Sequence, residues 1–273
     1  MKRSLAILLA GGLALVAPGC AHRAARGPDL VTQYSVIDAL LAGDYNGSLS
    51  CAELRRHGDF GIGTFDKLDG EMTLLDGVVY AIRADGRVDR VAGAETTPFA
   101  TVTFFKPDRY EGRLVSGLAY AAFQEELRRQ LPTPNHFYAV WVYGRFHRVK
   151  TRSVPRQAPP YVPLAEVTKN QSVFEFADVE GNLVGFWSPP FAKGVNVPGW
   201  HFHFLTRDRK GGGHVLDFEL RDGAAWLDGK SAVTVLLPDT GDFLRTDLAP
   251  DRAGELHRVE KDPMSASPAP PAR

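Results

Sequence analysis

The stretch from Gly199 to Phe218 reads GWHFHFLTRDRKGGGHVLDF and predicts a β-hairpin. Its aromatic residues are typical of strands, and the glycine run before the last histidine is typical of the connecting turn. Side chains alternate between the two faces of a strand, so His201 and His203 should share one face. The return strand should bring His214 beside them, because opposing Cβ atoms of paired strands lie about 5 Å apart. The hairpin therefore predicts three imidazoles that converge on one point.

Three histidines on one face of a hairpin favour a metal site. Three neutral nitrogen ligands with room for water or substrate are typical of catalytic zinc, whereas a structural zinc site is usually closed by four ligands. A His-x-His pair alone more often consists of two buried core histidines than of metal ligands. The third histidine makes a metal site the favoured interpretation. A cupin or facial-triad iron site is the competing interpretation. The ten-residue spacer before His214 contains no glutamate, which favours zinc on His201, His203 and His214.

The rest of the chain predicts mainly β-structure with few helices. A meander of strands is expected at 71–75, 78–82 and 87–91, joined by Asp-Gly turns at 76–77 and 85–86. Helices are expected at 54–57, behind a Ser50–Glu53 capping box, and at 116–131, while 29–42 fits a short helix or strand. Further strands are expected at 61–65, 100–105, 136–149, 172–176, 182–187, 199–206, 214–220 and 234–237.

A Pro-rich stretch at 154–163 is the best candidate for a linker. The fold class is therefore predicted as α/β or α+β, with two lobes built on mixed or antiparallel sheets. The N-terminal lobe would span residues 29–152 and the C-terminal, metal-binding lobe residues 153–262, with the zinc hairpin in the latter. The tail 263–273 reads PMSASPAPPAR and is predicted to be disordered.

The charge balance excludes one class of partner. The 32 Lys and Arg residues equal the 32 Asp and Glu residues among 273, and no basic stripe is present. Nucleic-acid binding is therefore set aside, because it needs a positive surface.

The first residues, MKRSLAILLAGGLALVAPGC, predict export. A basic start, an apolar run and small residues before the cleavage site are typical of a signal peptide, here residues 1–19. The residues around the cleavage site resemble a bacterial lipobox that ends at Cys20. Lipidated Cys20 would anchor a periplasmic protein to a membrane through a tether at 20–28. Plain cleavage and a soluble exported protein are the alternative. Cys51 would then be the remaining thiol, expected to be a small buried residue.

Several segments, in the same order, resemble bacterial α-acetolactate decarboxylases. They are GIGTF at 61–65, LDGEM at 68–72, DGVVY at 76–80, TPFA at 97–100, KTR at 150–152 and the hairpin at 199–218. The resemblance extends from about residue 30 to 262. The signal peptide and the Pro-rich tail depart from it, since many family members are cytoplasmic.

The resemblance implies a homodimer that decarboxylates 2-acetolactate to acetoin with zinc on the three histidines. It assigns Glu71 and Arg152 as the site carboxylate and guanidinium, Thr64 as a pocket residue, and Glu260 as a second carboxylate for which Glu255 is the alternative. The metal would chelate two substrate oxygens and accept the electrons left by carbon dioxide. Arg152 would stabilise the anion, and a glutamate would donate the proton.

Two other functions stay open from the sequence. One is a different exported metalloenzyme that acts on another 2-hydroxy-3-keto acid. The other is a non-catalytic envelope protein that binds a metal or a small acid.

Overall fold

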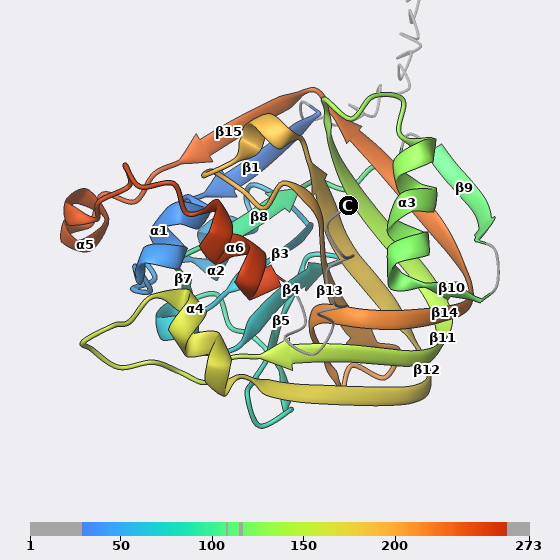
Figure 1. Ribbon diagram of the computed structural model, residues 1–273, viewed down its shortest axis with the longest axis horizontal. Helices are drawn as coiled ribbons and strands as arrows, with labels where there is room; N and C mark the ends of the chain where they lie inside the picture. Colours follow the sequence, from blue (N-terminus) through green and yellow to red (C-terminus); the bar gives the residue numbers. More distant parts are fainter. Residues whose placement is uncertain (1–28, 108, 115–116, 261–273) are drawn as a thin grey trace, which may run out of the picture.

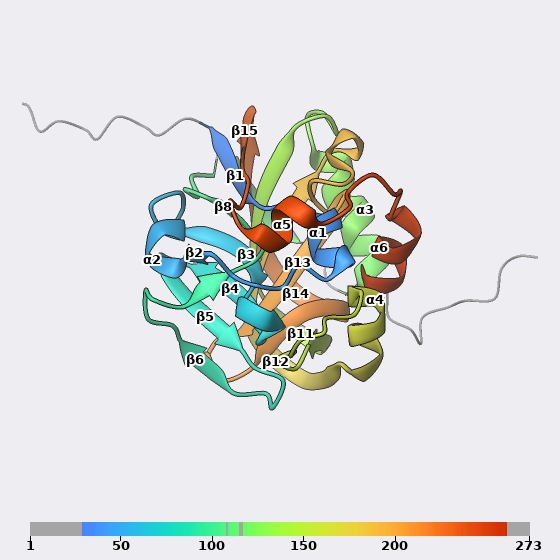
Figure 2. The same ribbon diagram turned by 90° about the vertical axis from the view of Figure 1, so that its left-hand side faces the viewer.

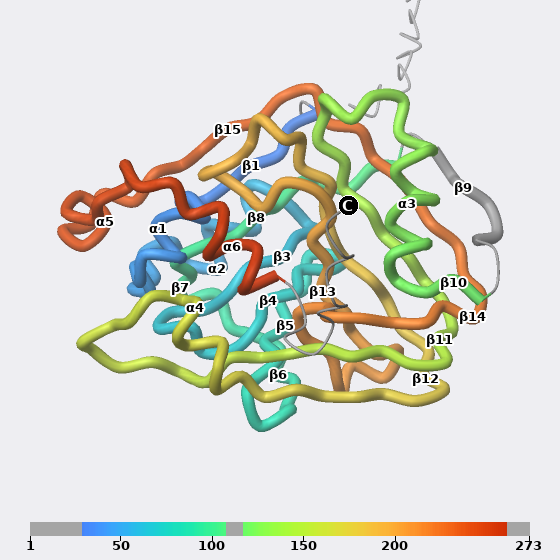
Figure 3. The backbone as a smooth tube through the Cα atoms, in the orientation of Figure 1, coloured from blue at the N-terminus to red at the C-terminus, as the bar shows by residue number. Residues whose placement is uncertain are grey.

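Two β-sheets pack against each other in the computed structural model, which describes residues 29–107, 109–114 and 117–260 (Figure 1). The first sheet has seven strands in the order β15-β1-β8-β3-β4-β5-β6. Its strands are β1 (Leu30–Tyr34), β3 (Phe60–Thr64), β4 (Glu71–Leu75), β5 (Val78–Ile82), β6 (Val88–Arg90), β8 (Ala100–Thr103) and β15 (Ala232–Leu236). Figure 3 shows the late strand β15 running alongside the early strand β1, and these two strands are parallel.

Long antiparallel strands form the second sheet. Its strands are β9 (Arg109–Leu114), β10 (Leu118–Ala119), β11 (Phe137–Ser153), β12 (Ser172–Ser188), β13 (Gly199–Thr206) and β14 (Gly212–Lys230). The order β10-β14-β11-β12-β13 is closed by an additional pairing of β14 with β13. Large aromatic side chains, among them Phe146, Phe202, Phe204 and Phe218, fill its core against helix α3 (Tyr120–Gln130).

Short helices cover one end of the two sheets, as Figure 2 shows. They are α1 (Ile37–Ala42), α4 (Leu164–Val167), α5 (Gly241–Arg245) and α6 (Ala253–Glu260), while α2 (Cys51–Leu54) lies beside the small strand pair β2 (Leu49–Ser50) and β7 (Thr96–Thr97). Single 3-10 turns occur at Asp66–Leu68, Thr168–Asn170 and Pro190–Ala192. Apolar residues of α1, α4 and α6 form one buried cluster, so these helices hold a common position next to the sheets.

The predicted fold class is confirmed, because the chain is mainly sheet with few helices. The meander is also confirmed: Leu75 pairs with Val78 across a two-residue turn in which Asp76 and Gly77 both have positive φ, as a type I′ turn requires. Ser50 caps α2 by accepting a hydrogen bond from the Glu53 amide, although the helix begins at Cys51 and not at residue 54. Segment 29–42 contains both a strand and a helix.

Several predicted boundaries differ from the structure. The strands expected at 172–176 and 182–187 are one continuous strand, β12, because β11 pairs with it from Ser172 to Trp187, while β13 pairs with its second half from Gly181 to Ser188. Helix α3 begins at Tyr120, since 118–119 are taken up by pairing with β14. The predicted lobe boundary at 152/153 does not coincide with the division between the sheets. Strands β9 to β11 already belong to the second sheet, and β15 returns to the first.

Two further expectations concern residues at the margins of the fold. Cys51 is buried, as expected, and is a free thiol. The signal peptide, Cys20, the tether and the tail 263–273 lie outside the described residues. Within 29–260, apart from the three positions not described, no helix is long and apolar enough to cross a membrane.

Candidate metal centre

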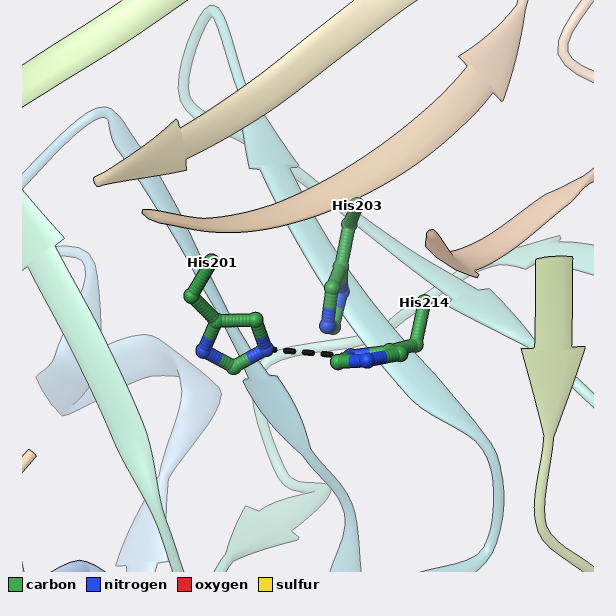
Figure 4. A group of neighbouring side chains, drawn as sticks. All are labelled: His201, His203 and His214. Atoms are coloured by element: carbon green, nitrogen blue, oxygen red, sulfur yellow. Dashed lines mark hydrogen bonds between the residues drawn. The ribbon is translucent and has the colours of Figure 1, made fainter. Parts of the chain in front are cut away.

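The predicted hairpin consists of β13 and β14, and it places the three histidines as expected. His203 lies directly opposite His214 in the pairing of the two strands. His201 precedes by two positions on the same face, and the three rings have centroids 4.9–5.5 Å apart (Figure 4). Trp200 and Phe202 lie on the other face and stack on each other in the aromatic core. Alternation along the strand therefore separates the imidazoles from the core.

Hydrogen bonds fix which ring nitrogens can accept a metal. Nδ1 of His203 lies 2.8 Å from the carbonyl oxygen of Met72. A carbonyl only accepts, so the neutral ring carries its proton on Nδ1 and its lone pair on Nε2. Nε2 of His201 and Nδ1 of His214 face each other at 3.1 Å. Three nitrogen atoms thus face a common point from two neighbouring strands.

Burial keeps these rings neutral. The side chains of His201, His203 and His214 are at most 8% exposed. Desolvation lowers the pKa of His201 to about 3, and the positive charge of Arg152 lowers it further. The pKa values of His203 and His214 are also well below the usual value, again chiefly because of burial. Neutral imidazole is the form that binds a metal.

An ion pair lies next to the histidines. Arg152, on β11, pairs in register with His214 of β14, so it extends the row of site residues across a third strand. Its Nη1 lies 3.3 Å from Oε1 of Glu71, the first residue of β4 in the other sheet. The second carboxylate oxygen, Oε2, lies 3.6 Å from Nε2 of His203. Glu71 thus sits between the guanidinium and a candidate metal ligand.

Glu260 reaches the same centre from the end of α6. Its Oε2 lies 3.5 Å from Nε2 of His214, whereas Glu255, on the preceding turns, pairs with Arg252 at 3.1 Å. The structure therefore brings Glu260, and not Glu255, to the histidines. Its carboxylate faces the nitrogen of His214 that is directed away from His201.

Both glutamates are poised to exchange protons near neutral pH. Burial raises the pKa of Glu71 to about 7 despite the opposing effect of Arg152, and the charge of Glu260 adds to the rise. Burial raises the pKa of Glu260 to about 7 as well, again opposed by Arg152. A carboxyl group with such a pKa can act as a general acid or base at physiological pH.

A small pocket joins all of these groups. It has a volume of about 40 Å³ and is lined by the three histidines, Glu71, Arg152, Glu260 and Thr64, together with apolar side chains from α1, α4 and nearby loops. Thr64 ends β3 opposite Glu71, and its hydroxyl donates to the Gly70 carbonyl at 2.8 Å. The expected metal ligands, the two expected charged residues Glu71 and Arg152, Thr64 and Glu260 therefore lie in one place, between the two sheets.

The donor set fits a zinc ion. In the described part of the chain, the three histidines form the group whose possible ligand atoms all lie within 4.8 Å of one another. Two nitrogens that are each about 2.0–2.1 Å from a tetrahedral zinc lie about 3.3 Å apart, close to the observed 3.1 Å between His201 and His214. Three protein ligands leave a fourth position for a substrate or water, as in catalytic zinc sites.

Two parts of the site were not expected from the residues alone. One is the Met72 carbonyl, which holds the His203 ring and has no sequence signal because it is a backbone atom. The other is the apolar wall made by residues such as Ile37, Leu40 and Phe99. Their hydrophobic character indicated burial, but nothing local indicated which cavity they would line.

Comparisons with known proteins agree with this geometry. The family model described as alpha-acetolactate decarboxylase matches residues 31–250. An alpha-acetolactate decarboxylase of Methanosarcina mazei is 51% identical over 85% of this chain and 81% of its own length, and one of Bacillus licheniformis is 41% identical over 86% and 93%. The crystal structure of alpha-acetolactate decarboxylase from Bacillus subtilis strain 168 superimposes with a TM-score of 0.84 at 39% identity, covering 85% of this chain and all of that one.

Proposed function

The chain belongs to the alpha-acetolactate decarboxylase family, and from this premise we propose that it is a zinc-dependent carboxy-lyase that converts 2-acetolactate to acetoin. The observation that carries the proposal is the convergence of three buried neutral imidazoles with the Glu71–Arg152 pair in one pocket. Zinc on His201, His203 and His214 would act as a Lewis acid towards the substrate oxygens.

Arg152 is suited to orient the substrate carboxylate. Its guanidinium remains charged and offers two parallel donors, and Nε has no hydrogen-bond partner among the described residues. Contact with Arg152 would direct the carboxylate into the small pocket. The same positive charge would stabilise the negative charge that develops on the oxygens as the C1–C2 bond breaks.

Glu71 and Glu260 can supply the proton that replaces carbon dioxide. Each has a raised pKa of about 7, so a protonated fraction is present at neutral pH. They approach from different elements, β4 and α6, and lie next to different histidines, Glu71 beside His203 and Glu260 beside His214. Protonation from one side would give one enantiomer of acetoin.

The direct test is conversion of racemic acetolactate by the purified mature chain. We expect acetoin and carbon dioxide in equal amounts, one zinc ion per chain, loss of activity on chelation, and recovery when zinc is added back. Full activity of a metal-free preparation would contradict the zinc assignment. A panel of 2-hydroxy-3-keto acids separates this enzyme from one with another substrate, and retention of acetolactate without product would indicate a binding protein.

We further propose an exported homodimer that is anchored to the periplasmic face of a membrane through lipidated Cys20. The export signal in residues 1–20 supports the location, and family membership supports the dimer. Light scattering of the mature protein tests the oligomeric state: a mass of one chain at micromolar concentration would rule out a stable dimer.

A further inference from the structure

Two cavities of different size meet at the metal centre. His201, His214 and Glu260 line both of them. The inner pocket has about 40 Å³ and the outer groove about 900 Å³. A water molecule needs roughly 10–15 Å³ on the same kind of measure, so the inner pocket holds only a few small groups. The outer groove is far larger than acetolactate, a five-carbon acid, requires.

The inner pocket defines the polar end of a bound substrate. Arg152 and Glu71 line it and do not line the groove. Its remaining walls are buried apolar side chains, including Ile37, Leu68 and Phe99. A carboxylate attracted by Arg152 therefore enters the pocket, where the walls leave no room for a bulky substituent.

One part of the outer groove has aromatic walls that can take an apolar group. It lies between α3 and α6 and is walled by Tyr120, Trp187 and Trp200, with Ala121 and Ala253 facing it from the two helices. The rings of Trp187 and Trp200 meet edge to face at 5.0 Å, and each indole nitrogen is hydrogen-bonded to a backbone carbonyl. Lys193, Asp217 and His257 also line the groove, and the first two are already paired with Asp251 and Arg148. The part of the groove that is walled by the aromatic rings favours an apolar or aromatic occupant.

These observations fix the direction of an extended substrate. In a 2-hydroxy-3-oxo acid the acyl substituent is at the opposite end from the carboxylate. With the carboxylate in the inner pocket and the central oxygens at the histidines, the acyl substituent points to the groove. We propose that the site accepts 2-hydroxy-2-methyl-3-oxo acids whose acyl group is much larger than acetyl, including aromatic acyl groups; this rests on the proposed decarboxylation.

The chemistry does not depend on the acyl substituent. The C1–C2 bond breaks and carbon dioxide leaves, its bonding electron pair forms a C2–C3 double bond, and the π electrons of the C3 carbonyl move onto its oxygen. One proton then adds to C2, and the C3 carbonyl re-forms. The overall reaction is acid anion plus proton giving hydroxyketone plus carbon dioxide. No bond to the substituent on C3 changes, so its size is limited only by the groove.

The test compares acetolactate with 2-hydroxy-2-methyl-3-oxo-3-phenylpropanoate, in which phenyl replaces the terminal methyl. We expect the wild-type chain to convert the phenyl compound with a kcat/KM within 10-fold of that for acetolactate. Ala121→Phe should fill the groove and lower kcat/KM for the phenyl compound at least 10-fold. The kcat/KM for acetolactate should change less than 2-fold in the same variant. Ala253→Phe, from the other wall, should do the same. Ala122→Phe, at an exposed neighbouring position that does not line the groove, should change neither.

A binding measurement gives a readout independent of turnover. The acid 2-hydroxy-2-methyl-4-phenylbutanoate lacks the ketone and cannot lose carbon dioxide by this route. Its binding should change the tryptophan fluorescence of the holoenzyme, and Trp200→Phe should remove most of that change. Inhibition of acetolactate turnover by this acid without any change in fluorescence would overturn the assignment of the groove.

The two proposals fail in distinguishable ways. If acetolactate gives no acetoin, the proposed function is wrong. If acetolactate is converted normally while the phenyl compound is converted at less than 1% of its rate, the function stands and the groove does not receive the acyl group. Equal losses for both substrates in Ala121→Phe and Ala253→Phe would also overturn the inference.

Discussion

Arg152 Nη1 lies 3.3 Å from Glu71 Oε1, and the two residues belong to different sheets. Their side chains are 6% and 8% exposed, so this ion pair is buried at the contact between the sheets. A buried pair costs solvation free energy and contributes little net stability, whereas loss of one partner leaves an unpaired charge. The pair therefore serves the site more than the fold.

Arg152→Lys should lower activity although it keeps the positive charge. An ammonium group cannot donate two parallel hydrogen bonds to a carboxylate. Hydrogen bonds to charged groups contribute about 1.5–3 kcal/mol, so we expect kcat/KM for acetolactate to fall ~10–100-fold. Steady-state kinetics at saturating zinc provide the measurement, and Arg156→Lys, at a half-exposed arginine paired with Asp66 and Asp69, is the control. Unchanged kinetics in Arg152→Lys would show that Arg152 does not touch the substrate.

Glu71→Gln should keep the metal and slow turnover. The substitution preserves size and polarity but removes the titrating group, and general acid catalysis contributes about 10²–10⁴-fold. We expect kcat to fall within that range while metal analysis still gives one zinc per chain. Glu255→Gln, at a carboxylate that pairs with Arg252, serves as the control. Loss of zinc would place Glu71 among the metal ligands. An unchanged turnover rate with racemic acetoin as the product would mean that Glu71 only determines which face of the intermediate is protonated.

The metal centre is largely predictable because its main part is local. Alternation along one strand and a short turn determine that His201, His203 and His214 converge, and both features are readable within twenty residues. The meander is predictable for the same reason, since Asp76-Gly77 specifies its own turn. What the residues alone could not predict is the opposite wall. Glu71 faces the hairpin from another sheet, and only the family resemblance assigned it in advance.

Long-range pairing explains the remaining differences. The return of β15 to β1 joins residues about two hundred positions apart, and no local pattern specifies such a partner. Helix α6 has eight residues, and its two buried positions, Leu256 and Val259, give too short a pattern to predict a helix. Glu260 therefore reaches the site through packing between distant helices and not through local sequence.

Asp44→Asn should stabilise the protein at neutral pH. Burial raises the pKa of Asp44 to about 6, the charge of Asp242 adds to the rise, and Oδ1 has no hydrogen-bond partner among the described residues. The folded state therefore binds a proton more tightly than the unfolded state, whose pKa is about 3.9. This residue favours folding at acidic pH, and that contribution is lost as the pH rises from about 4 through 6.

We expect Asp44→Asn to increase the free energy of unfolding by about 1–2 kcal/mol at pH 7.5 and to change it little at pH 4.5. The estimate allows for partial solvent screening of the carboxylate. Urea denaturation at both pH values gives the difference, with Asp239→Asn, at an exposed aspartate, as the control. Equal effects of Asp44→Asn at the two pH values would show that the ionisation of Asp44 does not oppose folding.

The last prediction concerns the anchor at Cys20, which precedes the described residues. A basic start, an apolar run and small residues before the cysteine predict that the mature chain begins at a lipidated Cys20. Each buried methylene of an acyl chain contributes about 0.8 kcal/mol, and more than one chain gives stable membrane attachment. Cys20→Ser should therefore release active enzyme from the membrane fraction, with unchanged kcat/KM, because the tether at 20–28 precedes the first strand of the fold. Fractionation and mass spectrometry of the N-terminus provide the measurement. Wild-type protein found wholly in the soluble fraction, with a first residue other than Cys20, would leave simple secretion as the mode of export.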